Sequence, residues 1–292
     1  MLPRMVMLQI ENDDGLVAPA LVAALDGWVD AGGAATTAAG HVAAEGSRVA
    51  IFDDDHFYDY RARRPTLDIV DGRPATLAWP ELVVRRAKVG DRDVLVLTGP
   101  EPDFHWRELT VVAVALARRL GVTEWISLGA IPAAVPHTRG VPILGTESAP
   151  GLLRAGVTPG PAGTLRVPAA AISILDHAIA HAGIPAIGYF AQVPHYVTGA
   201  YVPAAVELLR VLGLHLGHDV ALGALREESR QVLARLDAAA AADEGTRGYV
   251  ERLEATVDEA RRPSGDDLIT EIERFLRDSG PNGGRNEGGR ST

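Results

Sequence analysis

The sequence predicts an α/β fold: a layered α/β/α sandwich with a mostly parallel or mixed sheet, followed by a C-terminal helical subdomain. Short apolar runs alternate with longer amphipathic stretches through the first two thirds of the chain, as strand–helix–strand crossovers require. Glycine- and proline-rich loops directly follow three of the apolar runs, at Gly27–Gly33, Leu97–Pro102 and Leu128–Pro132. After Pro203 strand signals become rare and the pattern is helical.

The first half of the chain alternates predicted strands and helices. The predicted strands are the apolar runs Met5–Ile10, Ala18–Leu25, Arg48–Phe52, Leu82–Lys88 and Asp93–Thr98. The small-residue stretch Ala31–Glu45 predicts a helix that ends at Gly46, and His105–Leu120 predicts another because its apolar residues recur at spacings of three and four. Asp53–Pro80 mixes charges, prolines and aromatics without a clear period, so we expect a long surface excursion there.

The alternation continues in the second half of the chain. Trp125–Leu128 and Ala186–Ala191 predict strands, and Ala169–Ala182 predicts a helix closed by Gly183. The glycine- and proline-rich stretch Pro132–Pro168 contains short apolar patches and predicts strands and loops near the edge of the sheet.

Three regions follow from these patterns. Residues 1–202 form the predicted α/β core domain, and residues 203–278 form a helical subdomain or arm. An amphipathic stripe from Leu225 to Val257 and a capping-box-like helix start at Ser264–Asp267 support the helical region. Residues 279–292 are polar, have no apolar groups to bury and predict a disordered tail.

Composition excludes several functional classes. A chain of 292 residues with 47% hydrophobic residues can bury a substantial core. The net charge of -10 argues against non-specific binding of nucleic acid, and the lack of cysteine excludes disulfides, thiolate nucleophiles and cysteine-bound zinc. No apolar segment approaches the roughly 18 residues that a membrane span needs, and the N-terminus does not resemble a signal peptide. We therefore expect a cytoplasmic, soluble protein with neither nucleic acid nor membrane as partner.

Loops at the carboxyl ends of strands form the usual ligand surface of open α/β sheets, so they carry the candidate binding residues. In the first loop, Gly27 and Gly32 allow close approach of a ligand to the backbone, and Asp30 and Trp28 offer a carboxylate and a ring. The helix N-terminus that follows favours an anion. The alternative is a tight turn in which Asp30 caps the helix and Trp28 packs.

The second loop contains Gly99 and Glu101, followed by Asp103, His105 and Trp106. Two carboxylates and an imidazole within one turn suit general acid–base chemistry or a hard metal ion, and the indole suits stacking. The alternative is a stiff, solvated turn in which Asp103 is the helix N-cap.

Two further candidates come from later loops. Arg139, close to His137, suits bidentate binding of phosphate or carboxylate, although a solvated loop explains it as well. His195 follows a strand and is predicted to face the same edge as the carboxylates of the other loops, which together outline a polar pocket. The alternative for His195 is a hydrogen bond to a backbone carbonyl and packing beside Tyr196.

Other histidines and acidic residues predict no metal site. Asp53–His56 places acidic residues beside a histidine, but consecutive side chains of an extended segment point to opposite faces. His177 and His181 have helical spacing without the glutamate of zinc proteases, so exposure to solvent explains them better. There is no Gly-any-Ser-any-Gly elbow. We assign no catalytic residues, metal ligands or cofactor.

Three motifs occur in a fixed order along the chain: Gly27-Trp28-Val29-Asp30-Ala31-Gly32, Leu97-Thr98-Gly99-Pro100-Glu101-Pro102 and Val193-Pro194-His195-Tyr196. In order and spacing they resemble the bacterial, actinobacterial-type, proteasome assembly chaperone family. The resemblance covers roughly residues 5–275. It implies a sandwich with a phosphorylase- or hydrolase-like topology, related to purine nucleoside phosphorylases, that assembles into homo-oligomers such as trimers.

The same resemblance implies no established reaction, although some members carry a label linking them to ATP-grasp carboxylate–amine ligases. The sequence has no glycine-rich loop followed by lysine and no recognisable pair of metal-binding carboxylates on adjacent strands. Members that act on proteasomes end in a hydrophobic-Tyr-any motif that inserts between core-particle subunits. This sequence ends Gly289-Arg290-Ser291-Thr292, so we do not expect it to dock on the proteasome core particle in that way.

Two functions follow. The first is a non-enzymatic, oligomeric assembly or interaction protein that uses the helical region and the strand-end loops as partner surfaces. The second is a binder or enzyme for a nucleoside-like or phosphorylated small molecule. A deep pocket that joins Asp30, Glu101, Arg139 and His195 favours the second, and its lack favours the first. We favour the first.

Overall fold

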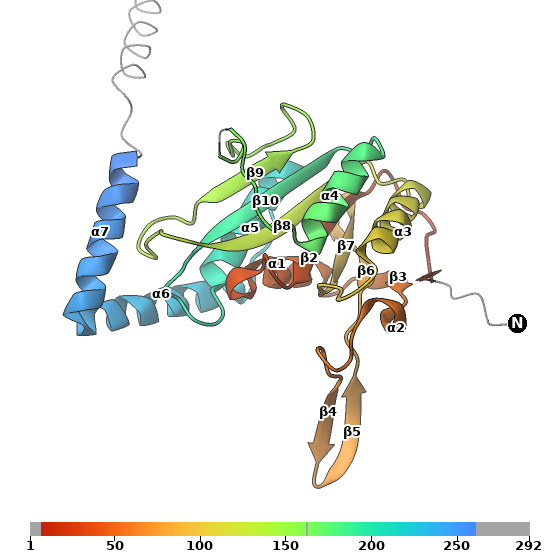
Figure 1. The fold of residues 1–292 in the computed structure, drawn as a ribbon, viewed down its shortest axis with the longest axis horizontal. Helices are drawn as coiled ribbons and strands as arrows, with labels where there is room; N and C mark the ends of the chain where they lie inside the picture. The colour runs from red at the N-terminus through yellow and green to blue at the C-terminus, as the bar shows by residue number, and fades with distance from the viewer. Residues whose placement is uncertain (1–6, 162, 261–292) are drawn as a thin grey trace, which may run out of the picture.

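The computed structural model describes residues 7–161 and 163–260 and confirms the predicted α/β/α sandwich (Figure 1). An eight-stranded mixed sheet has the order β1-β3-β6-β7-β2-β8-β10-β9. The sheet strands are β1 (Leu8–Ile10), β2 (Ala20–Asp26), β3 (Ser47–Phe52), β6 (Val83–Val89), β7 (Arg92–Pro100), β8 (Glu124–Ala133), β9 (Ile143–Glu147) and β10 (Ala186–Pro194).

The centre of the sheet is parallel and its margins are antiparallel. β7, β2, β8 and β10 run parallel to one another, whereas β6 and β9 flank them in the antiparallel sense. The central strands read as nearly continuous apolar runs because helices cover both faces of the sheet. In β2, for example, every residue except the last is buried. β9 lies at the edge, as expected for the glycine- and proline-rich stretch that contains it.

Two pairs of helices cover the two faces of the sheet (Figure 1). On one face α1 (Ala34–Ala43) packs beside α5 (Val202–Leu216), and on the other α3 (Trp106–Arg119) packs beside α4 (Ala171–His181). Each pair closes its own apolar core, one around residues such as Leu208 and the other around residues such as Trp125. Small side chains of α1 allow that helix to lie close to the sheet.

The last two described helices extend away from the sheet as an arm (Figure 1). α6 (Leu225–Ala242) packs against α5, and α7 (Glu244–Ala260) packs against α6. α5 itself lies in the core, since its residues 208, 209, 211 and 212 are fully buried. The division between a core and a helical subdomain at residue 202 stays a prediction, and the predicted helix start at Ser264–Asp267 and the tail 279–292 lie outside the described residues.

The excursion predicted between β3 and β6 is confirmed, but it contains structure that the sequence pattern did not reveal. A hairpin of β4 (Thr66–Val70) and β5 (Arg73–Ala78) projects from the sandwich, with every residue of both strands exposed (Figure 1). Before it, α2 (Asp54–Phe57) forms one helical turn. The extended geometry assumed for Asp53–His56 holds only for Asp53 and is wrong for the three residues that follow, because they are helical.

The parallel strands continue further than their apolar runs predict. β8 runs through Pro132 to Ala133, and β10 runs to Pro194, because the two strands pair with each other to their ends. Proline is tolerated at 132 because β2 pairs with β8 only over residues 124–127, and beyond them Asp30 forms a single bridge to Ala130, so that side of the ladder is open at Pro132. Among the described residues, no helix is long and apolar enough to span a bilayer.

Candidate functional site

The strand-end loops gather along one rim of the sheet, as the sequence predicts. In the parallel ladders Asp26 is opposite Pro100, and Val193 is opposite Pro132. A further parallel bridge joins Asp30 to Ala130. The loops after β2, β7, β8 and β10 therefore form one continuous surface, which we call the strand-end rim.

Asp30 caps the first helix from within the rim. Its Oδ1 accepts hydrogen bonds from the backbone N–H of Ala35, at 2.7 Å, and of Thr36, at 3.3 Å, and its Oδ2 accepts one from the Thr36 hydroxyl. The side chain is buried, and this burial raises the pKa of its carboxyl. Gly33, in a left-handed conformation, occupies the N-cap position of α1, and Asp30 bonds the N–H groups of the first turn from three residues further back.

Close packing accounts for the two glycines that flank Asp30. A Cβ at Gly27 would lie 2.6 Å from Cβ of Glu101, and a Cβ at Gly32 would lie 2.8 Å from Cβ of Tyr201. The packing expected of Trp28 is wrong, because 68% of its surface is exposed. Trp28 is the one member of this loop that presents a large apolar surface to solvent.

Glu101 joins three elements of the rim. Its Oε2 accepts a hydrogen bond from the backbone N–H of Trp28 at 3.1 Å, and its Oε1 accepts one from Ala171 at the start of α4 at 2.6 Å. Gly99, two residues before it, packs so closely against the backbone at Glu81 that a Cβ there would lie 2.3 Å from the Glu81 carbonyl oxygen. Both residues therefore have structural partners within the protein.

The expected N-cap at Asp103 is wrong. His105 occupies the N-cap position of α3, in a left-handed conformation with φ 57°, and its side chain makes no capping hydrogen bond. Asp103 instead accepts a hydrogen bond from the backbone N–H of Asp59, at 3.0 Å, and pairs with Arg63 at 3.3 Å. Its carboxylate thus holds the segment before the hairpin.

Arg139 holds the helical arm. Its guanidinium donates to both carboxylate oxygens of Asp258, at 3.0 and 2.8 Å, and to Glu254 at 3.1 Å. Nearby, the buried His137 has Nδ1 2.7 Å from the Tyr196 hydroxyl and Nε2 3.2 Å from Asp237 of α6. The loop after β8 therefore binds both arm helices through charged and polar side chains.

His195 makes the hydrogen bond to a backbone carbonyl that the structural alternative for this residue predicts. Its Nδ1 lies 3.0 Å from the Ala133 carbonyl oxygen, which can only accept, so Nδ1 carries a hydrogen. In the neutral imidazole Nε2 is then an acceptor, and the Tyr249 hydroxyl donates to it over 3.0 Å. The ring also packs edge-on to Tyr196, with centroids 5.8 Å apart. Sequence patterns did not predict Tyr249, since an arm tyrosine carries no local signal of a distant partner.

The candidate residues Asp30, Glu101, Arg139 and His195 all lie along the rim, but they do not share a pocket. None of the three hollows described here is lined by any of them. Asp30 and Glu101 lie in helix-capping contacts, whereas Arg139 and His195 contact α7. A hollow of about 260 Å³ lies between the His137 loop and the arm, but it contains none of these four residues. The ligand-binding roles of all eight candidates stay predictions.

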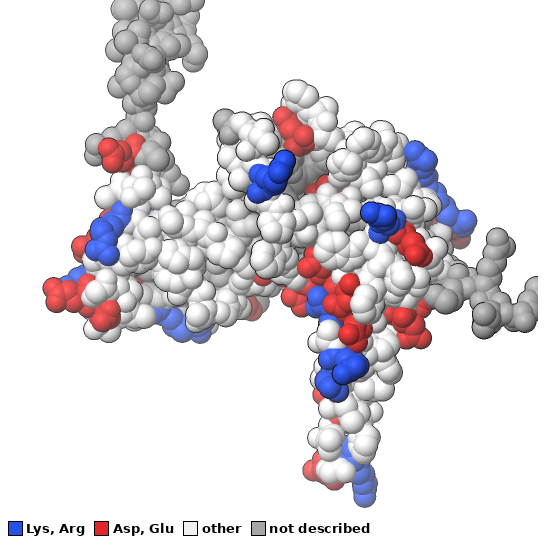
Figure 2. Space-filling view, in the orientation of Figure 1, with Lys and Arg blue, Asp and Glu red and all other residues white. Residues whose placement is uncertain are grey.

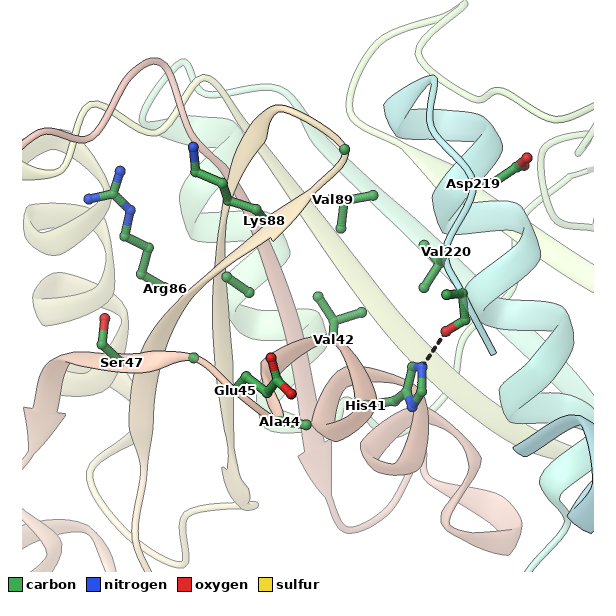
Figure 3. A pocket seen from close by; sticks show the side chains of 14 residues that line it. His41, Val42, Ala44, Glu45, Ser47, Arg86, Lys88, Val89, Asp219 and Val220 are labelled. Atoms are coloured by element: carbon green, nitrogen blue, oxygen red, sulfur yellow. Dashed lines mark hydrogen bonds between the residues drawn. The ribbon is translucent and has the colours of Figure 1, made fainter. Parts of the chain in front are cut away.

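Another hollow, of about 800 Å³, lies at the opposite end of the sheet (Figure 3). Its walls combine cationic side chains, including Lys88, with Glu45 and Asp219, so its charge indicates no single class of ligand. His41 spans one side, where its Nε2 lies 2.6 Å from the Ala221 carbonyl oxygen. A third hollow, of about 640 Å³, lies at the base of the hairpin.

Comparison with known proteins gives one consistent result. The model of the PAC2 family matches residues 24–240. No curated protein matches the chain. A PAC2 family protein from Streptomyces avermitilis is 35% identical over 75% of this chain and 94% of that chain, with a TM-score of 0.69.

Two structures from Mycobacterium tuberculosis are also similar. A proteasome-assembly chaperone homologue is 32% identical, with a TM-score of 0.72, over 79% of this chain and 99% of that chain. A protein of unknown function is 30% identical, with a TM-score of 0.78, over 92% of each chain. The family model covers the sandwich from the end of β2 onward and most of α6, and so includes the strand-end rim.

Proposed function

Because this chain belongs to the PAC2 family, we propose that it is a non-enzymatic protein of assembly-chaperone type that acts as a homo-oligomer in the cytoplasm. The observation that carries the proposal is that the polar side chains of the strand-end rim bond to other parts of the same protein. Asp30 and Glu101 cap helices, and Arg139 and His195 secure α7, so the polar groups that a substrate would need already have partners within the protein. The similarity to a proteasome-assembly chaperone homologue supports the same class of function.

The projecting hairpin is the surface that best fits a protein partner. Five large apolar side chains on and beside it are about half exposed or more: Leu67, Ile69, Val70, Leu77 and Trp79. Charged side chains gather at its base and tip, and much of the surface between them carries none (Figure 2). An isolated two-stranded hairpin is only marginally stable in water, and exposed apolar patches mark contact surfaces. We therefore assign the hairpin to a contact with a second copy of this chain.

Light scattering coupled to size-exclusion chromatography tests the proposal on the full chain. We expect an oligomer for the wild type and a monomer for Ile69→Asp, because a carboxylate would be buried without a partner in the contact. Val111→Asp on α3 is the matched control, since Val111 is also strongly exposed but lies away from the hairpin. We expect this variant to stay oligomeric.

Two results would overturn the proposal. One is a wild type that stays monomeric at all accessible concentrations. The other is a phosphorylated or nucleoside-like compound that raises the melting temperature of the wild type but not of Arg139→Gln, because such a compound would indicate a small-molecule site at the rim.

A further inference from the structure

Three potential metal ligands meet where the turn before the hairpin touches the start of α3. They are His56 of α2, His105 at the N-cap of α3 and Glu108 of α3, and one ligand atom from each lies within 4.8 Å of the others. Among the residues that the structure describes, no other group of three such side chains is as close. His56 and Glu108 are 52 positions apart in sequence, so only the fold brings them together.

The three side chains lie close enough to reach one tetrahedral ion once His105 rotates. Nε2 of His56 is 3.0 Å from one oxygen of Glu108, and Nδ1 of His105 is 3.3 Å from the other. Zinc bonds of about 2.0–2.2 Å to nitrogen and oxygen place neighbouring tetrahedral ligands roughly 3.3 Å apart. Two imidazoles and one carboxylate also form one of the ligand sets that zinc uses when a fourth position is left for water.

The backbone holds the two histidines against each other. Phe57, next to His56, accepts hydrogen bonds at its carbonyl oxygen from the backbone N–H of Asp103 and of Phe104, at 2.9 and 3.1 Å. His105 follows directly, with a positive φ of 57° that is uncommon for a residue other than glycine. The imidazole rings of His56 and His105 stack with centroids 4.1 Å apart. The loop after β7 is thus anchored to α2 at the position of the cluster.

Exposure leaves the cluster open to an ion. The side chains of His105 and Glu108 are 47% and 49% exposed, whereas that of His56 is 12% exposed. The two rings lie only 16° from parallel, so a shared ion requires His105 to turn, and its exposure leaves room for this rotation. His56 provides the fixed ligand, and the other two side chains close on the ion from the solvent side.

Neighbouring acidic groups favour a cation without competing as ligands. Asp54 accepts a hydrogen bond from the backbone N–H of Leu82 at 3.1 Å, and Asp55 accepts one from the Tyr60 hydroxyl at 2.7 Å. Their side chains therefore have other partners, yet their charges make the local potential more negative.

We propose that His56, His105 and Glu108 bind one divalent transition-metal ion of the zinc class. The ion would connect α2, at the base of the hairpin, to α3 of the sandwich and so fix the direction of the hairpin. The metal ligands and the hairpin residues are different side chains, so metal binding can be measured separately from the oligomeric state.

Titration of the metal-free full chain with Zn²⁺, in competition with a chromophoric chelator, tests the site. We expect one equivalent to bind at neutral pH, and affinity to fall at least tenfold in His56→Gln and His105→Gln, since loss of even a supporting contact costs about 10–100-fold. The matched control is His177→Gln, because His177 and His181 form another close histidine pair, with centroids 4.4 Å apart, without a third ligand of the kind described above. Its affinity should equal that of the wild type.

Substitution of Co²⁺ identifies the ligands spectroscopically. We expect the visible absorption of tetrahedral Co²⁺ in the wild type and in His177→Gln, and its loss in Glu108→Gln. Equal Zn²⁺ affinities of the wild type, His56→Gln and His105→Gln would overturn the proposal, as would octahedral Co²⁺ spectra in all variants. Circular dichroism of each metal-free variant confirms that it is folded.

Discussion

The Tyr249 hydroxyl of α7 lies 3.0 Å from Nε2 of His195, the residue that follows β10. The other ring nitrogen of His195 is bonded to the Ala133 carbonyl at the end of β8. One imidazole therefore joins the arm to the ends of two neighbouring strands. A histidine that looks like a site residue in sequence instead forms part of the joint between the sandwich and its arm.

Tyr249→Phe should weaken this joint without unfolding the sandwich. The variant keeps the ring contacts with Tyr196 and His195 but loses one hydrogen bond, which contributes about 1 kcal/mol. We expect roughly fivefold faster amide exchange in α7 and unchanged exchange in β2 and β8, measured by hydrogen–deuterium exchange with mass spectrometry. Tyr60→Phe, which removes a hydroxyl bonded to Asp55, is the control and should leave α7 unchanged.

Arg139→Gln should make the docking of α7 insensitive to salt. In the wild type the guanidinium pairs with Glu254 and Asp258, and ionic attraction between partly exposed groups weakens as salt shortens the screening length to about 3 Å at 1 M. We expect faster exchange in α7 at low salt in the variant than in the wild type, and similar rates at high salt. Arg210→Gln removes a pair internal to α5 and should behave as the wild type. If the amide exchange rates of α7 in the wild type do not change with salt concentration, this prediction is contradicted.

Glu101→Gln should destabilise the whole sandwich. The carboxylate accepts hydrogen bonds from two backbone N–H groups, those of Trp28 and Ala171, and an amide can offer only one acceptor oxygen to them. The amide keeps one of these bonds, and because the bond to Trp28 is exposed and that to Ala171 only partly buried, losing the other costs about 1 kcal/mol, which urea unfolding should report. Glu251→Gln, at an exposed residue of α7, should change stability by less than about 0.5 kcal/mol. Equal losses in the two variants would show that Glu101 has no capping role.

The sequence predicted those elements that depend on local signals, namely the spacing of apolar residues and the positions of glycine and proline. The strand runs, the helix of residues 105–120 and the common rim followed from apolar spacing and from glycine and proline positions. The β4–β5 hairpin could not be predicted from the sequence, because both its strands are exposed and so lack the alternation that half-buried strands show. The role of Asp103 was also not predictable, since its residue type fits a helix cap, while its actual partners at 59 and 63 are distant in sequence.

The candidate site shows the same limit more clearly. Arg139 and His195 lie at the rim as expected, but their partners Asp258 and Tyr249 belong to the arm, and no local pattern states which residues will meet there. His56 and His105 each lie in a sequence segment that also contains acidic residues, which are potential metal ligands. Their convergence depends on the helical turn α2 and on its contact with the loop after β7, which sequence spacing does not encode.

Asp176 should make stability fall as pH rises. Its Oδ1 accepts hydrogen bonds from Nε1 of Trp125, at 2.8 Å, and from the Ser127 hydroxyl, and burial raises the pKa of its carboxyl to about 7. Because the unfolded carboxyl titrates near 3.9, the folded state binds more protons between about pH 4 and pH 7. Stability from this group is therefore complete below pH 4, declines up to pH 7 and is constant above it.

Asp176→Asn isolates this contribution, because the amide oxygen can still accept from Trp125 while no charge forms. Each unit of pKa shift corresponds to about 1.4 kcal/mol, so the wild type should lose on the order of a few kcal/mol relative to the variant between pH 4 and pH 8. Urea unfolding at several pH values measures the difference. Asp219→Asn on the exposed turn after α5 should retain the wild-type dependence. Parallel curves for the wild type and Asp176→Asn would mean that folding does not raise the pKa of this carboxyl.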